Sequence, residues 1–338
     1  MTDLIGDLLR QVSRSFYLSL AILPRPLREP IGLAYLLARA SDTVADTRLL
    51  RRPERLHHLA TLRAAYAGEP VDASTVARAC APLQAHAAER ELLERVGEAL
   101  ARVDRLPSDD RAAVRSVLAT ITEGQRFDLE RFPGEDAAGL AALDTLDELD
   151  HYTYLIAGCV GEFWTRLHVA HRPRLARWDV ASMSLSGVRF GKALQLTNVL
   201  RDIPADLRHG RCYVPARELA PLGLGARDLL DPGKASGARP LLDRLLHAAL
   251  EHYDVAWRYT LAIPRGEWRM RLACAWPLLI GLGTLAAIAR HPNPLAVDRP
   301  IKISRSDVRA ILARSSLAVW SDAALRREAG RLRATVRV

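Results

Sequence analysis

The sequence predicts an all-α protein, and three observations support this prediction. Alanine, leucine, arginine and glutamate dominate long stretches with helical periodicity, whereas strand-forming patterns are scarce. Hydrophobic residues make up 49% of the 338 residues, which is enough for a substantial buried core. The proline- and glycine-rich breaks are short, as turns between helices are. We therefore expect about a dozen helices in a single domain that spans residues 1–338.

Two helices are predicted from the signals at their first residues. Pro30 should open a helix that runs to about Thr47, because proline is favoured in the first turn. Pro107, followed by a serine and two aspartates, should open a second helix that reaches the region of Gly124.

Two further helices are predicted from charge and hydropathy. A helix is predicted over residues 143–168, because the acidic residues at its start, beginning with Asp144, suit the positive end of a helix. Residues 272–289 are uncharged and just long enough to be considered a membrane span. Pro277 weakens that interpretation, and a helix surrounded by protein would be equally apolar on every side. We favour the internal helix.

The net charge of +9 comes almost wholly from arginine, because the chain has only three lysines. This balance favours anionic partners such as nucleic acid, acidic lipid surfaces or phosphorylated metabolites. Arginines that merely solvate helix surfaces would give the same charge, so charge alone identifies no partner. The four cysteines lack metal-ligand spacing and a disulfide pattern, and the first residues do not show the pattern of a signal peptide, so we expect none. We expect a cytoplasmic protein.

The first polar motif contains Tyr35, Arg39, Asp42 and Asp46, whose offsets of 0, 4, 7 and 11 form a single stripe on a helix. Two carboxylates one turn apart repel each other unless a cation or solvent separates them. Mg²⁺ prefers oxygen ligands and is commonly shared between carboxylates and substrate phosphates. An exposed acidic edge paired with arginines would look similar, so this motif alone is a weak signal.

The second motif repeats this stripe with Gln195, Asn198, Asp202 and Asp206 at offsets 0, 3, 7 and 11. All four side chains offer oxygen ligands. Arg201 stands beside them and could bind phosphate oxygens in a bidentate fork. Because two such stripes on apolar helices are hard to explain as solvated faces, we interpret them together as sites for Mg²⁺ and phosphate.

Six segments that contain these motifs resemble the squalene/phytoene synthase family, and most closely its bacterial squalene synthases. They are Ser13–Phe16, Ala38–Asp46, Tyr152–Gly161, Gln195–Asp202, Gly210–Pro215 and Ile301–Arg305. The resemblance implies a single-domain isoprenoid synthase fold. In that fold an α-helical bundle encloses a central apolar cavity for two prenyl tails, with the aspartates at its mouth.

The resemblance also implies the metal ligands. Asp42 and Asp46 would bind Mg²⁺ with one diphosphate, while Asn198, Asp202 and Asp206 would bind Mg²⁺ from the facing helix. Magnesium and arginine would then stabilise the leaving diphosphate, which is the electrostatic part of the catalysis. Asp42 and Asp202 are therefore counted as catalytic as well.

The resemblance gives Tyr152 a place near the reacting carbons, where it would help remove a proton or steady a cation, and Tyr35 a related role. Either tyrosine would otherwise be an ordinary core aromatic residue. The substrate- and cofactor-binding residues implied are Ser13, Arg14, Phe16, Arg39, Ile156, Gln195, Arg201, Tyr213, Lys302 and Arg305.

The reaction implied is the head-to-head condensation of two farnesyl diphosphates through presqualene diphosphate, followed by reduction with NADPH to squalene. NADPH rests on the resemblance only, because the sequence has no glycine-rich dinucleotide fingerprint. Phytoene, dehydrosqualene and hydroxysqualene synthases remain open alternatives, since chain length depends on cavity depth. Residues 157–164 and 301–305 favour squalene.

Three departures from the family pattern bear on the site. Ala45 stands where eukaryotic squalene synthases carry a glutamate, so the first motif has two carboxylates and not three. Pro204 should kink or end the second helix, which makes Asp206 the least secure ligand. The cations of the last segment are spaced one residue wider than in eukaryotic enzymes, and of the two we favour Lys302 over Arg305.

The partners are less well defined by the sequence. The basic stretch from Leu325 to the C-terminus would suit a peripheral membrane contact, whereas the oligomeric state is not indicated. A nucleic-acid-binding module or a helical scaffold is the alternative from another class. We do not favour nucleic acid, because zinc spacing and a basic zipper are absent and the aspartates would repel phosphate without a metal.

Overall fold

The computed structural model describes residues 3–13 and 16–336 of the chain. Of the chain, 79% is helical, and two strands of two residues each are the only strands in these ranges, which confirms the all-α prediction. The chain divides into two compact units. Residues 1–130 and 162–180 form the first unit, and residues 131–161 and 181–338 form the second.

The described residues contain seventeen α-helices, with short 3₁₀ and π turns between them. In the first unit lie α1 (Leu9–Ser13), α2 (Tyr17–Ala21), α3 (Arg25–Asp46), α4 (Arg52–Ala67), α5 (Ser74–Cys80), α6 (Ala87–Glu94), α7 (Val96–Asp104), all but the last residue of α8 (Ser108–Arg131), and most of α10 (Cys159–His171). In the second lie β1 (Ala141–Ala142), α9 (Leu146–Thr153), nearly all of α11 (Val180–Arg208), β2 (Arg211–Cys212), α12 (Ala216–Leu219), α13 (Pro232–Ala235), α14 (Arg239–Ala262), α15 (Trp268–Arg290), α16 (Arg305–Ala318) and α17 (Asp322–Arg333).

The two helices predicted from proline signals are present, and one begins earlier than expected. α3 begins at Arg25 with Pro26 in its first turn, so Pro30 lies inside the helix and does not open it. The start can lie upstream because Pro30 removes only one hydrogen bond, and its ring is buried in the core. α8 begins directly after Pro107, as predicted, and continues to Arg131.

The helix predicted over residues 143–168 is present as a continuous helical run from Leu146 to His171. It begins after Thr145, whose Oγ1 accepts a hydrogen bond of 3.2 Å from the amide of Glu148. A π-helical turn, Tyr154–Gly158, joins α9 to α10. Because a π turn adds a residue to the helical repeat, it shifts the faces of the two helices relative to each other.

Glycines allow this run to contact the backbone of α11. A Cβ atom on Gly161 would lie 1.8 Å from the carbonyl oxygen of Gly187, and one on Gly191 would lie 2.0 Å from that of Ala157. Atoms cannot approach so closely, so no larger residue fits either position without moving the backbone. Gly161 and Gly191 thus allow the backbones of this run and α11 to approach closely.

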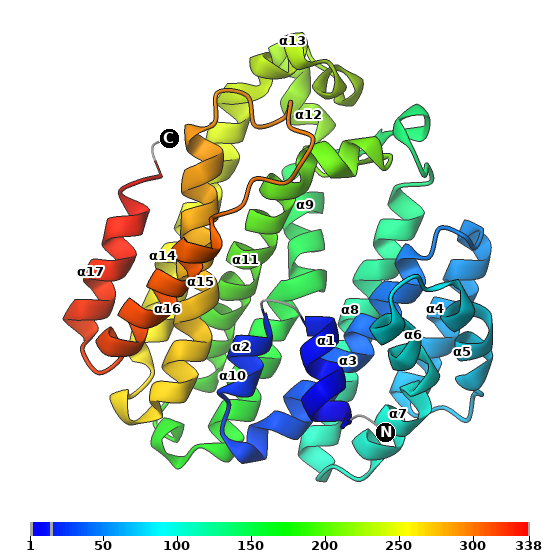
Figure 1. Cartoon of the computed structure of the whole chain (residues 1–338), viewed down its shortest axis with the longest axis vertical. Coiled ribbons are helices and arrows are strands. Elements are labelled where there is room, and N and C mark those ends of the chain that lie inside the picture. The colour runs from blue at the N-terminus through cyan, green and yellow to red at the C-terminus, as the bar shows by residue number, and fades with distance from the viewer. Residues whose placement is uncertain (1–2, 14–15, 337–338) are drawn as a thin grey trace. The chain divides into compact units, whose positions relative to one another are not determined.

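The apolar stretch over residues 272–289 lies within α15. The helical stretch Arg265–Arg290 is long and apolar enough to cross a membrane, but 78% of its most apolar window is buried inside the protein. That burial favours the internal helix over a membrane span. α15 packs against α14, α16 and α17, which lie beside it in Figure 1.

The two short strands position the segment that follows α11. β1 and β2 pair in parallel, with Ala141 opposite Arg211. Gly210 precedes β2 with φ +81°, where a Cβ atom would lie 2.8 Å from a backbone oxygen. The turn at Gly210 therefore requires glycine, and it directs the chain through Cys212 to Tyr213.

Candidate functional site

The first polar stripe is the one face of α3 that stays accessible. Beyond its first turns, α3 buries every residue except Tyr35, Ala38, Arg39, Asp42 and Asp46. The predicted residues therefore share a stripe, as the helical offsets require.

Arg39 is held between two carboxylates within the first unit. Its Nη1 lies 2.5 Å from Oδ2 of Asp42, and its Nη2 lies 2.5 Å from Oε1 of Glu89 on α6. Burial would lower the pKa of Arg39, but Asp42 and Glu89 outweigh that effect and raise it. A permanent positive charge thus lies beside the first aspartate.

Two predicted aromatic residues meet at the same stripe. The rings of Phe16 and Tyr35 stack with centroids 5.7 Å apart and planes inclined by 13°. Ser13 is buried, and its hydroxyl donates a 2.5 Å hydrogen bond to the carbonyl of Leu9, so that donor is used inside its own helix. Arg14 lies outside the described residues.

Tyr152 and Tyr213 come together in the second unit. Their rings stack with centroids 4.7 Å apart, and Phe132 packs edge-on against Tyr213 at 5.0 Å. On α11, Gln195 places Nε2 3.5 Å from Oη of Tyr152 and accepts a 3.4 Å hydrogen bond from Asn198. The second stripe and the tyrosine predicted to be catalytic are therefore neighbours.

The remaining part of this stripe carries charge. Arg201 forms a bidentate pair with Asp202, in which Nε lies 2.9 Å from Oδ1 and Nη2 contacts Oδ2. Asp206 also belongs to α11, because the helix continues through Pro204 to Arg208. The expectation that α11 would end at Pro204 is wrong. Proline removes one hydrogen bond, but the buried apolar residues on both sides of it keep the segment packed as a helix.

The segment that carries Lys302 is attached to the end of this same helix. Arg208 donates hydrogen bonds of 3.3 and 3.2 Å to the carbonyls of Val297 and Asp298. Lys302 and Arg305 are exposed, and neither forms a hydrogen bond or an ion pair with the part of the chain that the structure describes. Arg208 thus ties residues 297 and 298, which precede the basic segment, to the C-terminal end of α11.

Ile156 lies in the π turn after Tyr152 and is half-buried. The same turn brings Tyr154 near Lys192 of α11, whose Nζ is 6.0 Å from its ring centroid. Lys192 also contacts the carboxylate of Asp150 at 2.6 Å. Lys192 was missed by the sequence analysis although it lies one turn before Gln195, where the helical offset marks it.

The donor set of each stripe suits Mg²⁺, which takes hard oxygen ligands. Asp42 and Asp46 lie one turn apart on α3, as Asp202 and Asp206 do on α11. Within residues 3–13 and 16–336, no group of three His, Cys, Asp or Glu side chains forms a ready metal cluster. Each stripe therefore fits an ion that keeps waters or substrate oxygens as its other ligands.

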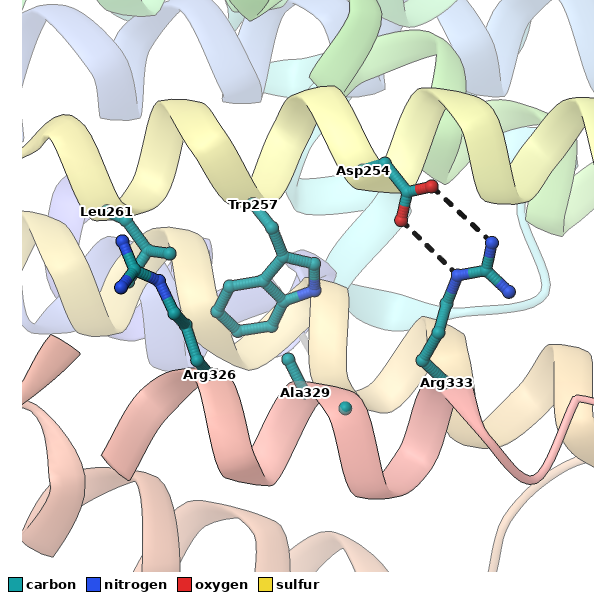
Figure 2. Close-up of a pocket in the computed structure, with 7 residues that line it drawn as sticks. Asp254, Trp257, Leu261, Arg326, Ala329 and Arg333 are labelled. Atoms are coloured by element: carbon teal, nitrogen blue, oxygen red, sulfur yellow. Dashed lines mark hydrogen bonds and ion pairs between the residues drawn. The ribbon is translucent and has the colours of Figure 1, made fainter. Parts of the chain in front are cut away.

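A small pocket between α14 and α17 contains none of the predicted residues (Figure 2). Trp257, Leu261 and Ala329 line it, and Asp254 and Arg333 close one side with an ion pair of 3.3 Å. Its volume is about 200 Å³. Pockets for small-molecule ligands are usually roughly 300 Å³ or larger, so the polar stripes remain the better candidate site.

Comparison with known proteins agrees with the segments singled out above. The sequence profile of the squalene/phytoene synthase family matches residues 9–307. The 15-cis-phytoene synthase of Synechocystis sp. is 28% identical over 262 residues, which cover 75% of this chain and 67% of that protein. The squalene synthase of Schizosaccharomyces pombe is 25% identical over 312 residues, which cover 91% of this chain and 64% of that protein. The structure of TcSQS with the ligand BPH1237 matches with a TM-score of 0.76 at 22% identity, covering 97% of this chain and 90% of that one.

Proposed function

Because the chain belongs to the squalene/phytoene synthase family, we propose that it joins two farnesyl diphosphates head to head and reduces the product to squalene. The chain has the helical isoprenoid synthase fold of that family. The observation that carries the proposal is the pair of oxygen-rich stripes, each with an arginine bound to its aspartate. Mg²⁺ and NADPH are the cofactors that we propose, and nucleic acid is not among the partners.

In the first step, the C1–O bond of one farnesyl diphosphate breaks and its electron pair leaves with the diphosphate. Mg²⁺ bound to Asp42 and Asp46, or to Asn198, Asp202 and Asp206, would neutralise that charge. Arg39 beside the first stripe and Arg201 beside the second each offer guanidinium donors to diphosphate oxygens, and their partial burial would strengthen that interaction.

The allylic carbon is then attacked by the C2–C3 double bond of the second molecule, and loss of a proton closes the cyclopropane of presqualene diphosphate. Tyr152 is the residue that we propose to receive or relay this proton. Its hydroxyl is near the amide of Gln195, and its ring is fixed against Tyr213. Tyr35, stacked on Phe16, would steady cationic charge with its ring.

Presqualene diphosphate would then lose its own diphosphate and rearrange, and NADPH would supply the hydride that completes squalene. Lys302 and Arg305 would bind a phosphate of this reductant, because both are exposed cations in a segment anchored beside α11. Phytoene synthase is the second candidate. Its support is the 28% identity to a phytoene synthase, against 25% to a squalene synthase that matches more of this chain.

The test is to incubate the purified protein with Mg²⁺ and labelled farnesyl diphosphate, with and without NADPH, and to identify the extracted products by mass spectrometry. We expect squalene only when NADPH is present. If dehydrosqualene or hydroxysqualene forms irrespective of NADPH, the product of the enzyme is not squalene but a compound whose formation needs no hydride. Turnover of geranylgeranyl diphosphate alone would favour phytoene.

The site is tested by Asp42→Asn and Asp202→Asn, which keep side-chain size but remove one charge from each stripe. We expect each to raise the Mg²⁺ concentration needed for half-maximal turnover and to lower kcat at least about 100-fold. Asp254→Asn is the matched control, because its carboxylate pairs with Arg333 at a pocket that contains none of the predicted residues. Equal effects of all three substitutions would contradict the assignment.

A further inference from the structure

The outer face of α16 carries large apolar side chains at its C-terminal end. Arg309, Ala313, Leu317 and Trp320 are spaced by three or four residues and are all exposed. Leu317 is 85% exposed and Trp320 is 54% exposed. The opposite face of the helix is buried, so this stripe is what α16 presents to solvent.

A second tryptophan extends this apolar surface. The ring of Trp320 lies 5.9 Å from that of Trp268 at the start of α15, with the planes inclined by 46°. The guanidinium of Arg269 lies 5.2 Å from the Trp268 ring. We call Leu317, Trp320 and Trp268 the tryptophan corner. It is formed where α16 turns into α17, beside the start of α15 (Figure 1).

Two cations lie at the tryptophan corner. Arg269 and Arg314 are exposed and form no ion pair with any residue that the structure describes. Arg314 lies one turn before Leu317 on the same side of α16. By contrast, nearby Arg265 is paired with Asp322 at 2.9 Å. The cations at the rim are therefore available to an external anion.

We propose that the tryptophan corner docks the protein on the surface of an anionic phospholipid membrane. Tryptophan suits the membrane interface, where its ring meets acyl chains and its N–H meets water, and an exposed leucine can enter the acyl region. Guanidinium groups bind lipid phosphates in a bidentate fork.

A second copy of the chain is the other partner to weigh. In a symmetric dimer the tryptophan corner of one subunit would face the same corner of the other. This arrangement brings the like-charged arginines of the two subunits together. An anionic surface attracts these same arginines. Charge complementarity thus favours the membrane.

The test measures flotation of the full-length protein with vesicles, without substrate, so that its outcome is independent of the proposed catalytic function. Vesicles are made of phosphatidylcholine alone or of phosphatidylcholine mixed with phosphatidylglycerol. We expect binding to the mixed vesicles that weakens with added salt. Leu317→Gln with Trp320→Gln should lower the partition coefficient about tenfold or more, because it removes the exposed apolar groups that would enter the membrane.

Matched controls come from equally exposed positions elsewhere. Leu49, which is 75% exposed, is changed to Gln and should leave binding unchanged. Arg314→Gln should weaken binding to anionic vesicles about fivefold, whereas Arg177→Gln should not, although Arg177 is likewise exposed. Equal flotation of wild type and the double variant would overturn the proposal. So would a dimer, seen by sedimentation velocity, that the double variant abolishes while wild type does not float.

Discussion

Arg39 on α3 and Glu89 on α6 are joined by a 2.5 Å contact between Nη2 and Oε1, although 50 positions separate them in the sequence. The other terminal nitrogen of the same guanidinium contacts Asp42. Because Arg39 is planar and rigid at its tip, fixing one nitrogen fixes the direction of the other. Glu89 is thus a positioning residue for the first stripe.

Glu89→Ala should lower kcat/KM for farnesyl diphosphate about tenfold, because Arg39 loses the partner that holds it beside Asp42. Glu89→Gln keeps an oxygen acceptor and should recover most of the activity. Steady-state kinetics with a Mg²⁺ titration measure both effects. Glu98→Ala is the control, since Glu98 pairs with Arg95 and not with Arg39. A loss equal to that of the control would show that Glu89 does not act through Arg39.

Tyr152→Phe should lower kcat about 100-fold, because it removes a hydroxyl that we propose to handle a proton. The melting temperature should change little, since the stacked ring against Tyr213 is kept. Tyr253→Phe provides the opposite case. It removes a 2.9 Å hydrogen bond to Thr197 and should cost about 1 kcal/mol of unfolding free energy while kcat persists. Thermal denaturation and product assays on both variants separate a catalytic role of Tyr152 from a structural role of Tyr253. Full activity of Tyr152→Phe would refute the catalytic role that we propose for Tyr152.

The part of the site that follows helical periodicity could be predicted from the sequence. Offsets of about one turn placed Asp42 with Asp46 and Asp202 with Asp206 on shared faces, and the α3 burial pattern agrees. Glu89 was not predictable, because its contact depends on how α6 packs against α3. Of the kink or end expected at Pro204, the end was wrong for a similar reason, since packing of the surrounding apolar residues overrides a local preference.

Gly161→Ala should destabilise the protein by about 3 kcal/mol or more, because its Cβ would meet the backbone oxygen of Gly187 at 1.8 Å. Backbone on both sides leaves no flexible side chain to yield. Gly330→Ala is the matched control in the last turn of α17, where nothing lies within 4 Å of the added Cβ. It should stabilise by up to about 1 kcal/mol. Urea denaturation measures both, and a neutral Gly161→Ala would contradict the close contact of the two backbones.

Stability should fall in mild acid because of His168 on α10. Burial, with a smaller effect of Arg172 and His171, lowers the pKa of His168 to about 3 from an ordinary value of 6.5. Between these two pH values the unfolded chain binds a proton that the folded chain does not, so the free energy of unfolding decreases as the pH falls. The full slope is about 1.4 kcal/mol per pH unit for one group.

His168→Asn removes this titration and keeps an N–H for the carbonyl of Trp164, which Nδ1 of His168 contacts at 2.9 Å. Urea denaturation at pH 8 gives the structural cost of the substitution, because His168 is then unprotonated in both the folded and the unfolded chain. Between about pH 6 and about pH 5, the wild type should lose about 1 kcal/mol more than the variant. His252, whose pKa is lowered to about 4 chiefly by burial, adds a slope of the same sign in both proteins and cancels in the difference. Parallel pH profiles would mean that His168 accepts a proton in the folded protein.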